Sequence, residues 1–582
     1  MRFLATLLFL GWANLALADA ADPLDTLIEE HWAWYLEQSP ESRTERGDHS
    51  ANDRWDNWGL DGLASSYRVQ GEFLKRLETI DASKLSADDE LNYQMFGRML
   101  RQNRQSYELG LDYMTLDMRE GPQHLHEIQQ FTPFKNEADY RKWLSRMASV
   151  PTLLQQYTGV LRKGMETQRV QPRVVIERVP AQIEKQLEAD IEDNVWYRPF
   201  RDMPDSIEAK TAKALQDEAR SLISKQVNPA YTEFRRFLLD AYLPACRAHP
   251  GIGTLPGGKE IYEFLARDFT TTELTPKEIH EIGKSEVARI LSEMEAVKAE
   301  TGFEGDLQAF NEFLRSDPQF YYDTPEALYE GYLAVSKRLD PELVKLFGVL
   351  PRMPYGLRPI SEESAPDTTT AYYMPPAANG TRAGYYYVNL YRPEVRPKYE
   401  MEVLSVHEAV PGHHLQIAIA QELEGLPEFR TESRVTAFTE GWGLYSERLG
   451  YQMGLYQDPY SRYGQLTYDM WRAVRLVVDT GMHYFGWSRQ RAIDYFKANA
   501  GKTETDIINE IDRYIGWPGQ ALAYKIGQLK ILELRAEAEK ALGDEFDIRS
   551  FHDELLGAGA IPLDALEIRM DRWLEAQLAT RG

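Results

Sequence analysis

The chain has 582 residues, and its 91 acidic side chains outnumber its 66 basic ones, which gives a formal net charge of −25. Such an acidic surface argues against nucleic acid and anionic membranes as partners, because both are negatively charged. Cys246 is the single cysteine, so no intramolecular disulfide can form. The fold must therefore be stabilised by its core, and a chain of this length can bury a large one.

The first 18 residues have the pattern of a secretory signal peptide. Arg2 precedes the apolar run 3–12, and an Ala-x-Ala cleavage site ends at Ala18, with a second such site ending at Ala20. The apolar run is too short to span a bilayer, and no cysteine follows it to which a lipid could be attached. We therefore expect an exported protein, secreted or periplasmic, with no membrane insertion once residues 1–18 are removed.

Most of the chain has the apolar periodicity of amphipathic helices. Residues 19–250 predict an N-terminal helical lobe, and residues 251–582 predict a second helical region that carries the candidate site. In the second region, Thr275, Pro276 and Glu278 predict a helix start with a capping box. We expect a mostly α, two-lobed fold with a cleft.

Residues 352–396 are the segment with a clear β pattern. Two runs rich in tyrosine, 371–374 and 385–391, are separated by turn-forming Pro, Asn and Gly residues. They predict a hairpin or small sheet just before a histidine-rich segment. Such a sheet either contacts a ligand or caps the core as a purely structural element.

Three histidines and a glutamate gather in residues 407–414, HEAVPGHH, in a chain with only 11 histidines. We interpret them as a metal site, because zinc hydrolases use neutral imidazoles as ligands and a carboxylate as base. The helical H-E-x-x-H pattern is absent, since Pro411 occupies the place of its second histidine. On an unbroken helix the later histidines would lie roughly 9 to 10 Å along the axis from His407, too far for one ion.

Pro411 and Gly412 predict how this gap is closed. Proline has no N–H to donate to the carbonyl of His407, and glycine adopts backbone conformations closed to other residues. A widened turn of the helix would then carry His413 back beside His407. His414 is the alternative second ligand.

Glu440 is the predicted third ligand. It follows His413 by 27 residues, which leaves room for a second, antiparallel helix. Gly441 and Gly443 flank it, and glycines inside a helix make sense where two helices approach closely. Glu447, two turns later on the same face, is either the rival ligand or a partner that orients a histidine.

Two imidazoles and one carboxylate would leave the fourth position of a single Zn²⁺ open, as in catalytic zinc sites. Glu408 would then act as the general base, which takes a proton from the attacking water and passes it to the leaving amine. The alternative for the whole cluster is a set of buried, hydrogen-bonded histidines without a metal.

A polar stripe marks a second segment. Arg472, Arg475, Asp479 and His483 share one face of a helix that is otherwise apolar, and a buried polar stripe must face partners or a wet cavity. In the cavity interpretation, His483 stabilises an oxyanion and one of the arginines binds a substrate carboxylate. In the alternative, the four side chains form an internal salt-bridge ladder.

The strings HEAVPGHHLQ (407–416) and FTEGWGLYSE (438–447) resemble the bacterial domain-of-unknown-function family 885 (DUF885), and the resemblance covers most of the mature chain. That family is grouped with zinc metallopeptidases of the two-histidine-plus-glutamate, gluzincin-like type, and it resembles their helical oligopeptidase and carboxypeptidase branch. The resemblance implies that an edge strand beside the metal pairs with the substrate backbone, with Tyr387 and Asn389 as contacts. It also favours Tyr524 as a catalytic phenol, for which packing is the alternative role.

The expected function is a zinc-dependent hydrolase of short peptides, a metallopeptidase. The chain has no serine-hydrolase elbow and no phosphate-binding loop, and Cys246 has no obvious base near it. Two alternatives remain: a metal-dependent amidase of a non-peptide or cell-wall conjugate, and a non-catalytic peptide-binding protein.

Overall fold

The computed structural model describes residues 23–187, 190–362, 365, 369–377, 380, 382–433 and 435–580. It is 71% helical and contains a small three-stranded sheet, so the prediction of a mostly α fold is confirmed. The predicted signal peptide, residues 1–18, lies outside the described residues. Among the helices of the described ranges, none is both long and apolar enough to cross a bilayer.

The α-helices fall on both sides of residue 250. Those before it are α1 (Pro23–Gln38), α2 (Pro40–Glu45), α3 (Leu60–Leu77), α4 (Ala87–Leu109), α5 (Glu137–Ala148), α6 (Val150–Glu166), α7 (Arg173–Ile176), α8 (Val179–Leu187), α9 (Ala209–Leu222), α10 (Asn228–Phe237) and α11 (Leu243–Ala245). Those after it are α12 (Gly258–Thr270), α13 (Pro276–Glu300), α14 (Leu307–Ser316), α15 (Pro325–Leu339), α16 (Met401–Glu408), α17 (His413–Glu422), α18 (Glu428–Thr431), α19 (Thr436–Leu449), α20 (Pro459–His483), α21 (Arg489–Asn499), α22 (Glu504–Gly516), α23 (Ala523–Leu542), α24 (Ile548–Leu556) and α25 (Leu563–Ala579).

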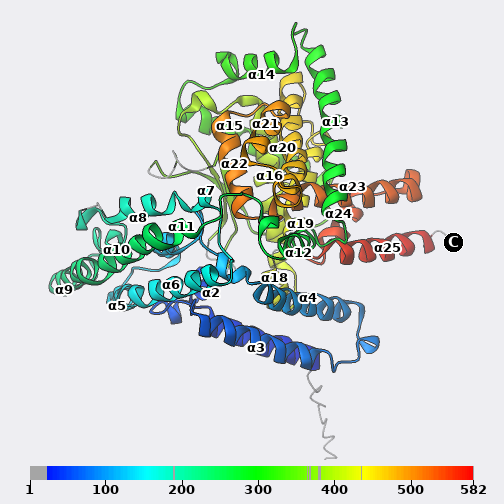
Figure 1. Cartoon of the computed structure of the whole chain (residues 1–582). Coiled ribbons are helices and arrows are strands. Elements are labelled where there is room, and N and C mark those ends of the chain that lie inside the picture. Colours follow the sequence, from blue (N-terminus) through cyan, green and yellow to red (C-terminus); the bar gives the residue numbers. More distant parts are fainter. Residues whose placement is uncertain are drawn as a thin grey trace, which may run out of the picture.

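In Figure 1, helices α3, α4, α5, α6, α9 and α10 lie below the group that contains α13, α14, α15, α20, α21 and α22. Two clusters of buried side chains hold these groups together. One joins α1, α3 and α4 to α15–α19 and α23–α25, and the other joins α5–α10 to α13, α14 and α20–α22. Each cluster takes residues from both sides of residue 250, so packing alone does not separate the predicted segments 19–250 and 251–582.

Helix α20 is buried along almost its whole length, as its apolar sequence predicts. It packs against α13, where Gly283 allows close approach because an added Cβ would lie 2.7 Å from the Cβ of Leu476. Helix α13 begins with the predicted capping box: Thr275 accepts a hydrogen bond from the N–H of Glu278, and the Glu278 carboxylate accepts one from the N–H of Thr275. This pair fixes the start of the helix that supports α20.

The sheet has the strand order β1 (Tyr355–Pro359), β3 (Gly384–Val388), β2 (Ala371–Met374). Strands β2 and β3 are antiparallel, as predicted, whereas the parallel partner β1 was not predicted as a strand. Side chains alternate between the two faces of a strand. Tyr386 is fully buried, and Tyr385 and Tyr387 therefore point to the opposite face. Strand β2 is an edge strand of the sheet.

Candidate metal centre

The two predicted histidine ligands lie on separate helices. Helix α16 ends at Glu408 and α17 begins at His413, so the chain leaves the helical path for four residues, and the expected widened turn within one helix is wrong. The break between the two helices requires glycine at position 412, because a Cβ there would lie only 1.9 Å from the carbonyl oxygen of His407. The rings of His407 and His413 meet with centroids 4.7 Å apart.

Glu440, on α19, reaches both rings. Its Oε2 lies 3.8 Å from Nε2 of His407 and 3.5 Å from Nε2 of His413. One potential ligand atom from each residue lies within 4.8 Å of the others. A tetrahedral zinc ion with bonds of about 2.1 Å keeps its ligand atoms roughly 3.4 Å apart, so the observed spacing fits one ion.

The same carboxylate oxygen has no hydrogen-bond partner among the described residues, although it is buried. An orphaned buried oxygen between two imidazoles is the arrangement that a cation would complete. Burial alone would raise the pKa of Glu440, but the nearby His413 imidazole brings that pKa below its ordinary value. This direction favours the carboxylate form that a metal ligand needs.

His407 is held in the orientation that a ligand needs. Its Nδ1 lies 2.9 Å from Oε1 of the fully buried Glu447, and this contact fixes the ring with Nε2 on the side of Glu440. Gly443 packs against the ring, where an added Cβ would lie 2.9 Å from Cε1. Burial lowers the pKa of His407 well below its usual value, which favours the neutral imidazole. Glu447 thus acts as the orienting partner of His407.

His414, the alternative second ligand, faces away from this cluster. Its Nδ1 lies 2.7 Å from the Tyr373 hydroxyl, and its Nε2 lies 3.1 Å from the carbonyl oxygen of Met353. Both ring nitrogens are therefore used. The structure brings His413 to the cluster in its place.

Glu408 follows His407 at the end of α16, where burial and the neighbouring Glu440 charge raise its pKa while His413 opposes the shift. The backbone N–H of Tyr373, in β2, donates to the Glu408 carboxylate. The edge strand thus lies directly beside the candidate base.

Arg472, Arg475 and Tyr524 also gather beside the cluster. The Arg475 guanidinium lies 4.4 Å from the centre of the Tyr524 ring, and that of Arg472 lies 6.0 Å from it. Burial raises the pKa of the Tyr524 phenol, and the nearby negative charge of Glu440 adds to this shift. A hydroxyl and two guanidinium groups therefore line one side of the predicted ligands.

The polar face of α20 does not form an internal ladder. Arg472 lies 3.8 Å from Glu447, Arg475 pairs with Glu510 of α22, and Asp479 accepts from Tyr262 and from a backbone N–H. Each of these side chains has at least one partner on another element. The stripe thus connects α20 to its neighbours, and only its arginines reach the metal cluster.

Three predicted residues are not brought to the cluster. His483 accepts from the N–H of Ile252 at 3.1 Å and donates to the carbonyl oxygen of Tyr514 at 3.0 Å, so neither ring nitrogen is left for an oxyanion. The buried Asn389 amide donates to the carbonyls of residues 365 and 369 and anchors that loop. Tyr387 stacks on Tyr372, on the opposite face of the sheet from the buried Tyr386.

Three side chains of α22 were not predicted as part of the site. Tyr514 donates to Glu510 at 2.6 Å and accepts from Nε of Arg475 at 2.8 Å, while Arg513 binds Glu510 at 2.9 Å. The sequence signal that could have identified them is the pair of charged residues Glu510 and Arg513, three positions apart on a partly buried helix, which resembles the polar stripe of α20.

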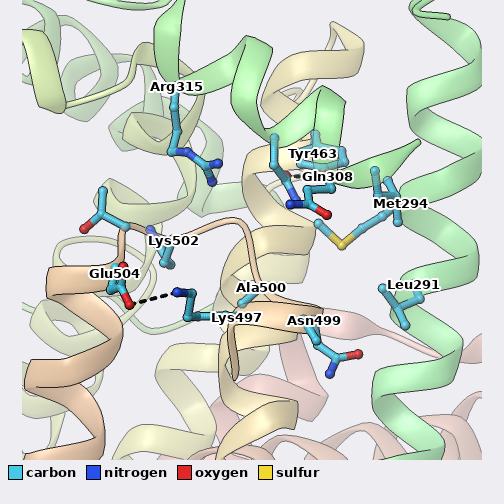
Figure 2. Close-up of a pocket in the computed structure, with 14 residues that line it drawn as sticks. Leu291, Met294, Gln308, Arg315, Tyr463, Lys497, Asn499, Ala500, Lys502 and Glu504 are labelled. Carbon is cyan, nitrogen blue, oxygen red and sulfur yellow. Dashed lines mark hydrogen bonds and ion pairs between the residues drawn. The ribbon is translucent and has the colours of Figure 1, made fainter. Parts of the chain in front are cut away.

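A cavity of about 560 Å³ lies elsewhere, between α13, α14, α20 and the segment that joins α21 to α22 (Figure 2). None of the predicted site residues lines it. Lys502 on its wall lies 4.8 Å from the centre of the Trp471 ring, which the two arginines also approach. The cavity and the cluster are thus neighbours along α20.

The fold and the cluster together define a mostly helical protein in which three helices, α16, α17 and α19, bring together a His–His–Glu triad beside a small sheet. A profile described as "Bacterial protein of unknown function (DUF885)" matches residues 40–570. The chain therefore belongs to the DUF885 family. A search of curated proteins found no match.

The solved structures that resemble the chain include the following two. One is the crystal structure of a provisionally assigned lipoprotein from Colwellia psychrerythraea, with 27% identity, a TM-score of 0.89, and coverage of 95% of this chain and 99% of that one. The other is a provisionally assigned lipoprotein of unknown function from Shewanella oneidensis, with 17% identity, a TM-score of 0.72, and coverage of 94% and 99%. The second likeness concerns the fold alone.

Proposed function

We propose that this protein is a zinc-dependent hydrolase of short peptides. The observation that carries the proposal is the orphaned Oε2 of Glu440 at 3.8 and 3.5 Å from the Nε2 atoms of His407 and His413. The hydrogen bond from His407 to Glu447 supports it, because zinc-binding histidines are commonly oriented in this way. His407, His413 and Glu440 would hold the ion.

A zinc ion held there would supply Lewis acidity, which polarises a carbonyl group and makes a water easier to ionise. Glu408 is the general base in this proposal: its carboxylate accepts the proton of the attacking water and returns it to the leaving amine nitrogen. The raised pKa of Glu408 suits both proton transfers. Tyr524 and Arg472 are the nearby donors that can stabilise the oxyanion.

The edge strand supports a peptide as the substrate. Strand β2 pairs with β3 on one side only, and its backbone is directed on the other side to Glu408. An extended peptide that pairs with this free edge would pass beside the base. The backbone hydrogen bonds would then bind peptides with little dependence on their sequence.

The decisive experiment is metal analysis of the purified protein and three variants. The parent protein and His249→Ala, which changes a loop histidine outside the cluster, should each bind one equivalent of zinc. His407→Ala should bind none. Glu408→Gln should keep the zinc and lose peptide hydrolysis. A parent protein that binds no zinc after dialysis against it would refute the proposal.

The same variants separate the two alternatives. A metal-dependent amidase would retain zinc but cleave acyl-amino acid or cell-wall conjugates in preference to a peptide panel. A peptide-binding protein would bind peptides equally well with Glu408→Gln and would release no product.

We also propose that the protein works in the periplasm. The predicted signal peptide supports this, as does the lipoprotein description of the similar structure from Colwellia psychrerythraea. Cell fractionation with a C-terminal tag tests it, and recovery with the cytoplasmic markers would contradict it.

A further inference from the structure

His414, the histidine that faces away from the metal cluster, contacts all three strands of the small sheet. Its ring packs against Tyr355 of β1, with centroids 4.9 Å apart, and against Tyr373 of β2, at 5.6 Å. In β3, Gly384 leaves room for the ring, because an added Cβ would lie 3.0 Å from Nδ1 of His414 and 2.3 Å from the Tyr373 hydroxyl oxygen. The sheet therefore meets helix α17 at this one side chain.

Two hydrogen bonds fix the His414 ring. The carbonyl oxygen of Met353, just before β1, can only accept, so Nε2 of His414 donates to it at 3.1 Å. In the neutral imidazole Nδ1 is then an acceptor, and the Tyr373 hydroxyl donates to it at 2.7 Å. The histidine is only 2% exposed, so the loss of either partner would leave a buried polar atom unsatisfied.

Tyr373 connects this histidine to the candidate base. Its side chain binds His414, whereas its backbone N–H donates to the Glu408 carboxylate. Strand β2 also packs directly on α16, the helix that ends at Glu408. His414 in turn follows His413, a candidate metal ligand, at the start of α17. The edge strand is therefore held at one residue by both of the helices that carry the candidate histidine ligands.

The free edge of β2 depends on such contacts, because an edge strand has backbone partners on one side only. Strand β2 is four residues long and pairs with β3 alone. A peptide that adds to this edge binds more tightly when the strand already has the paired conformation, since less conformational entropy is then lost. The contacts of Tyr373 should therefore influence peptide affinity.

We propose that His414 is a positioning residue for the substrate: by its bond to the Tyr373 hydroxyl, it holds β2 in the conformation that pairs with the backbone of a peptide. This inference rests on the proposed peptidase function. It gives His414 a role in peptide affinity and none in metal binding, although the residue lies next to a candidate ligand.

The test uses two replacements that each preserve one of the two hydrogen bonds. In His414→Asn the side-chain oxygen takes the place of Nδ1 and accepts from Tyr373, whereas in His414→Gln the longer amide takes the place of Nε2 and donates to Met353. Tyr373→Phe removes only the hydroxyl group. Tyr385→Phe is the matched control, because Tyr385 lies in β3 on the opposite face of the sheet, where its ring packs under Arg358.

Peptide binding to the zinc-loaded variants is measured by calorimetry in the Glu408→Gln background, and kcat and KM are measured with Glu408 in place. His414→Gln and Tyr373→Phe should weaken binding and raise KM by about 3- to 10-fold, the effect of one hydrogen bond, with kcat nearly unchanged. His414→Asn and Tyr385→Phe should stay within about twofold of the parent. Combining His414→Gln with Tyr373→Phe should weaken binding no further, because both remove the same bond.

A peptide with an N-methylated backbone distinguishes strand pairing from a general loss of structure. Methylation removes N–H groups that a paired peptide donates to β2, and it should weaken binding to the parent. The effect should be smaller in His414→Gln, where pairing already contributes less. A merely structural role of His414 would lower the stability of the variant and leave the difference between the two peptides unchanged.

Parent-like peptide affinity in both His414→Gln and Tyr373→Phe would overturn the inference, even if the parent hydrolyses peptides and the proposed function stands. Loss of zinc from either variant would also overturn it, because the effect would then be exerted at the metal. If peptide binding follows the expected pattern and no peptide is cleaved, the positioning role stands and the peptidase is refuted. Circular dichroism checks folding, and if His414→Gln does not fold, the comparison of Tyr373→Phe with Tyr385→Phe decides.

Discussion

The variant Gly443→Ala tests the candidate metal centre, because it adds a single carbon atom next to the His407 ring. In Gly443→Ala the new Cβ would lie 2.9 Å from Cε1 of His407 and 3.1 Å from Nε2. Ordinary contacts begin near 3.4 Å, so the imidazole must retreat by about 0.5 Å. The hydrogen bond to Glu447 and the surrounding core oppose this movement.

Metal–ligand distances tolerate changes of about 0.2 Å, which is less than the forced displacement. We therefore expect zinc affinity to fall by about 10- to 100-fold, as when the groups that orient a ligand are disturbed. This corresponds to about 1.4 to 2.7 kcal/mol. The same change should favour the helical conformation of α19 by about 1 kcal/mol, since alanine is a better helix former than glycine. A weaker zinc affinity would therefore not reflect a less stable helix.

Competition with a chromophoric chelator measures the affinity, and circular dichroism checks that the helices persist. Gly159→Ala is the matched control, because Gly159 lies inside α6 and an added Cβ meets no atom within 4 Å. It should bind zinc like the parent protein and unfold at a slightly higher temperature. Unchanged zinc affinity in Gly443→Ala would show that His407 is not a ligand in the observed orientation.

Three further predictions concern stability. The His31 imidazole is buried and has no hydrogen-bond partner among the described residues. Burial lowers its pKa from 6.5 in the unfolded chain to about 4 in the folded protein. Below pH 6.5 protons therefore bind the unfolded chain preferentially and destabilise the fold. Between pH 6.5 and 4, urea titrations should show the parent protein losing about 3 kcal/mol more than His31→Phe, and equal losses would contradict this. Thr275→Ala should lower the free energy of unfolding by about 1 kcal/mol by removing the cap of α13, with Thr275→Ser close to the parent. Lys525→Met should cost about 3 kcal/mol, since it removes the fully buried cation that pairs with Asp469 and Glu286, and a neutral effect in thermal melts would refute this.

The sequence predicts which three residues come together in the cluster better than it predicts the backbone that brings them together. Residue types and spacing select His407, His413 and Glu440 because few side chains suit zinc. Pro411 and Gly412 show that the helix must be interrupted, yet not by how much, since the observed break depends on contacts with the carbonyl groups of residues 406 and 407.

The residues that sequence reasoning placed wrongly, or did not find, depend on segments distant in the chain. His483 looks available on its helix, but its two nitrogens are occupied by backbone groups near residues 252 and 514. Asn389 likewise binds a loop about 20 residues earlier.

The close approach of α19 to α23 links the site to the end of the chain. A Cβ on Gly441 would lie 2.5 Å from the Cα of Gly527, so the helix that carries Glu440 rests directly on backbone from the C-terminal part of the protein. A chain truncated before α23 has both histidines but lacks the helix on which α19, with Glu440, rests. In the proposed zinc enzyme, such a truncated chain would bind zinc more weakly than the full chain, although it contains all three candidate ligands.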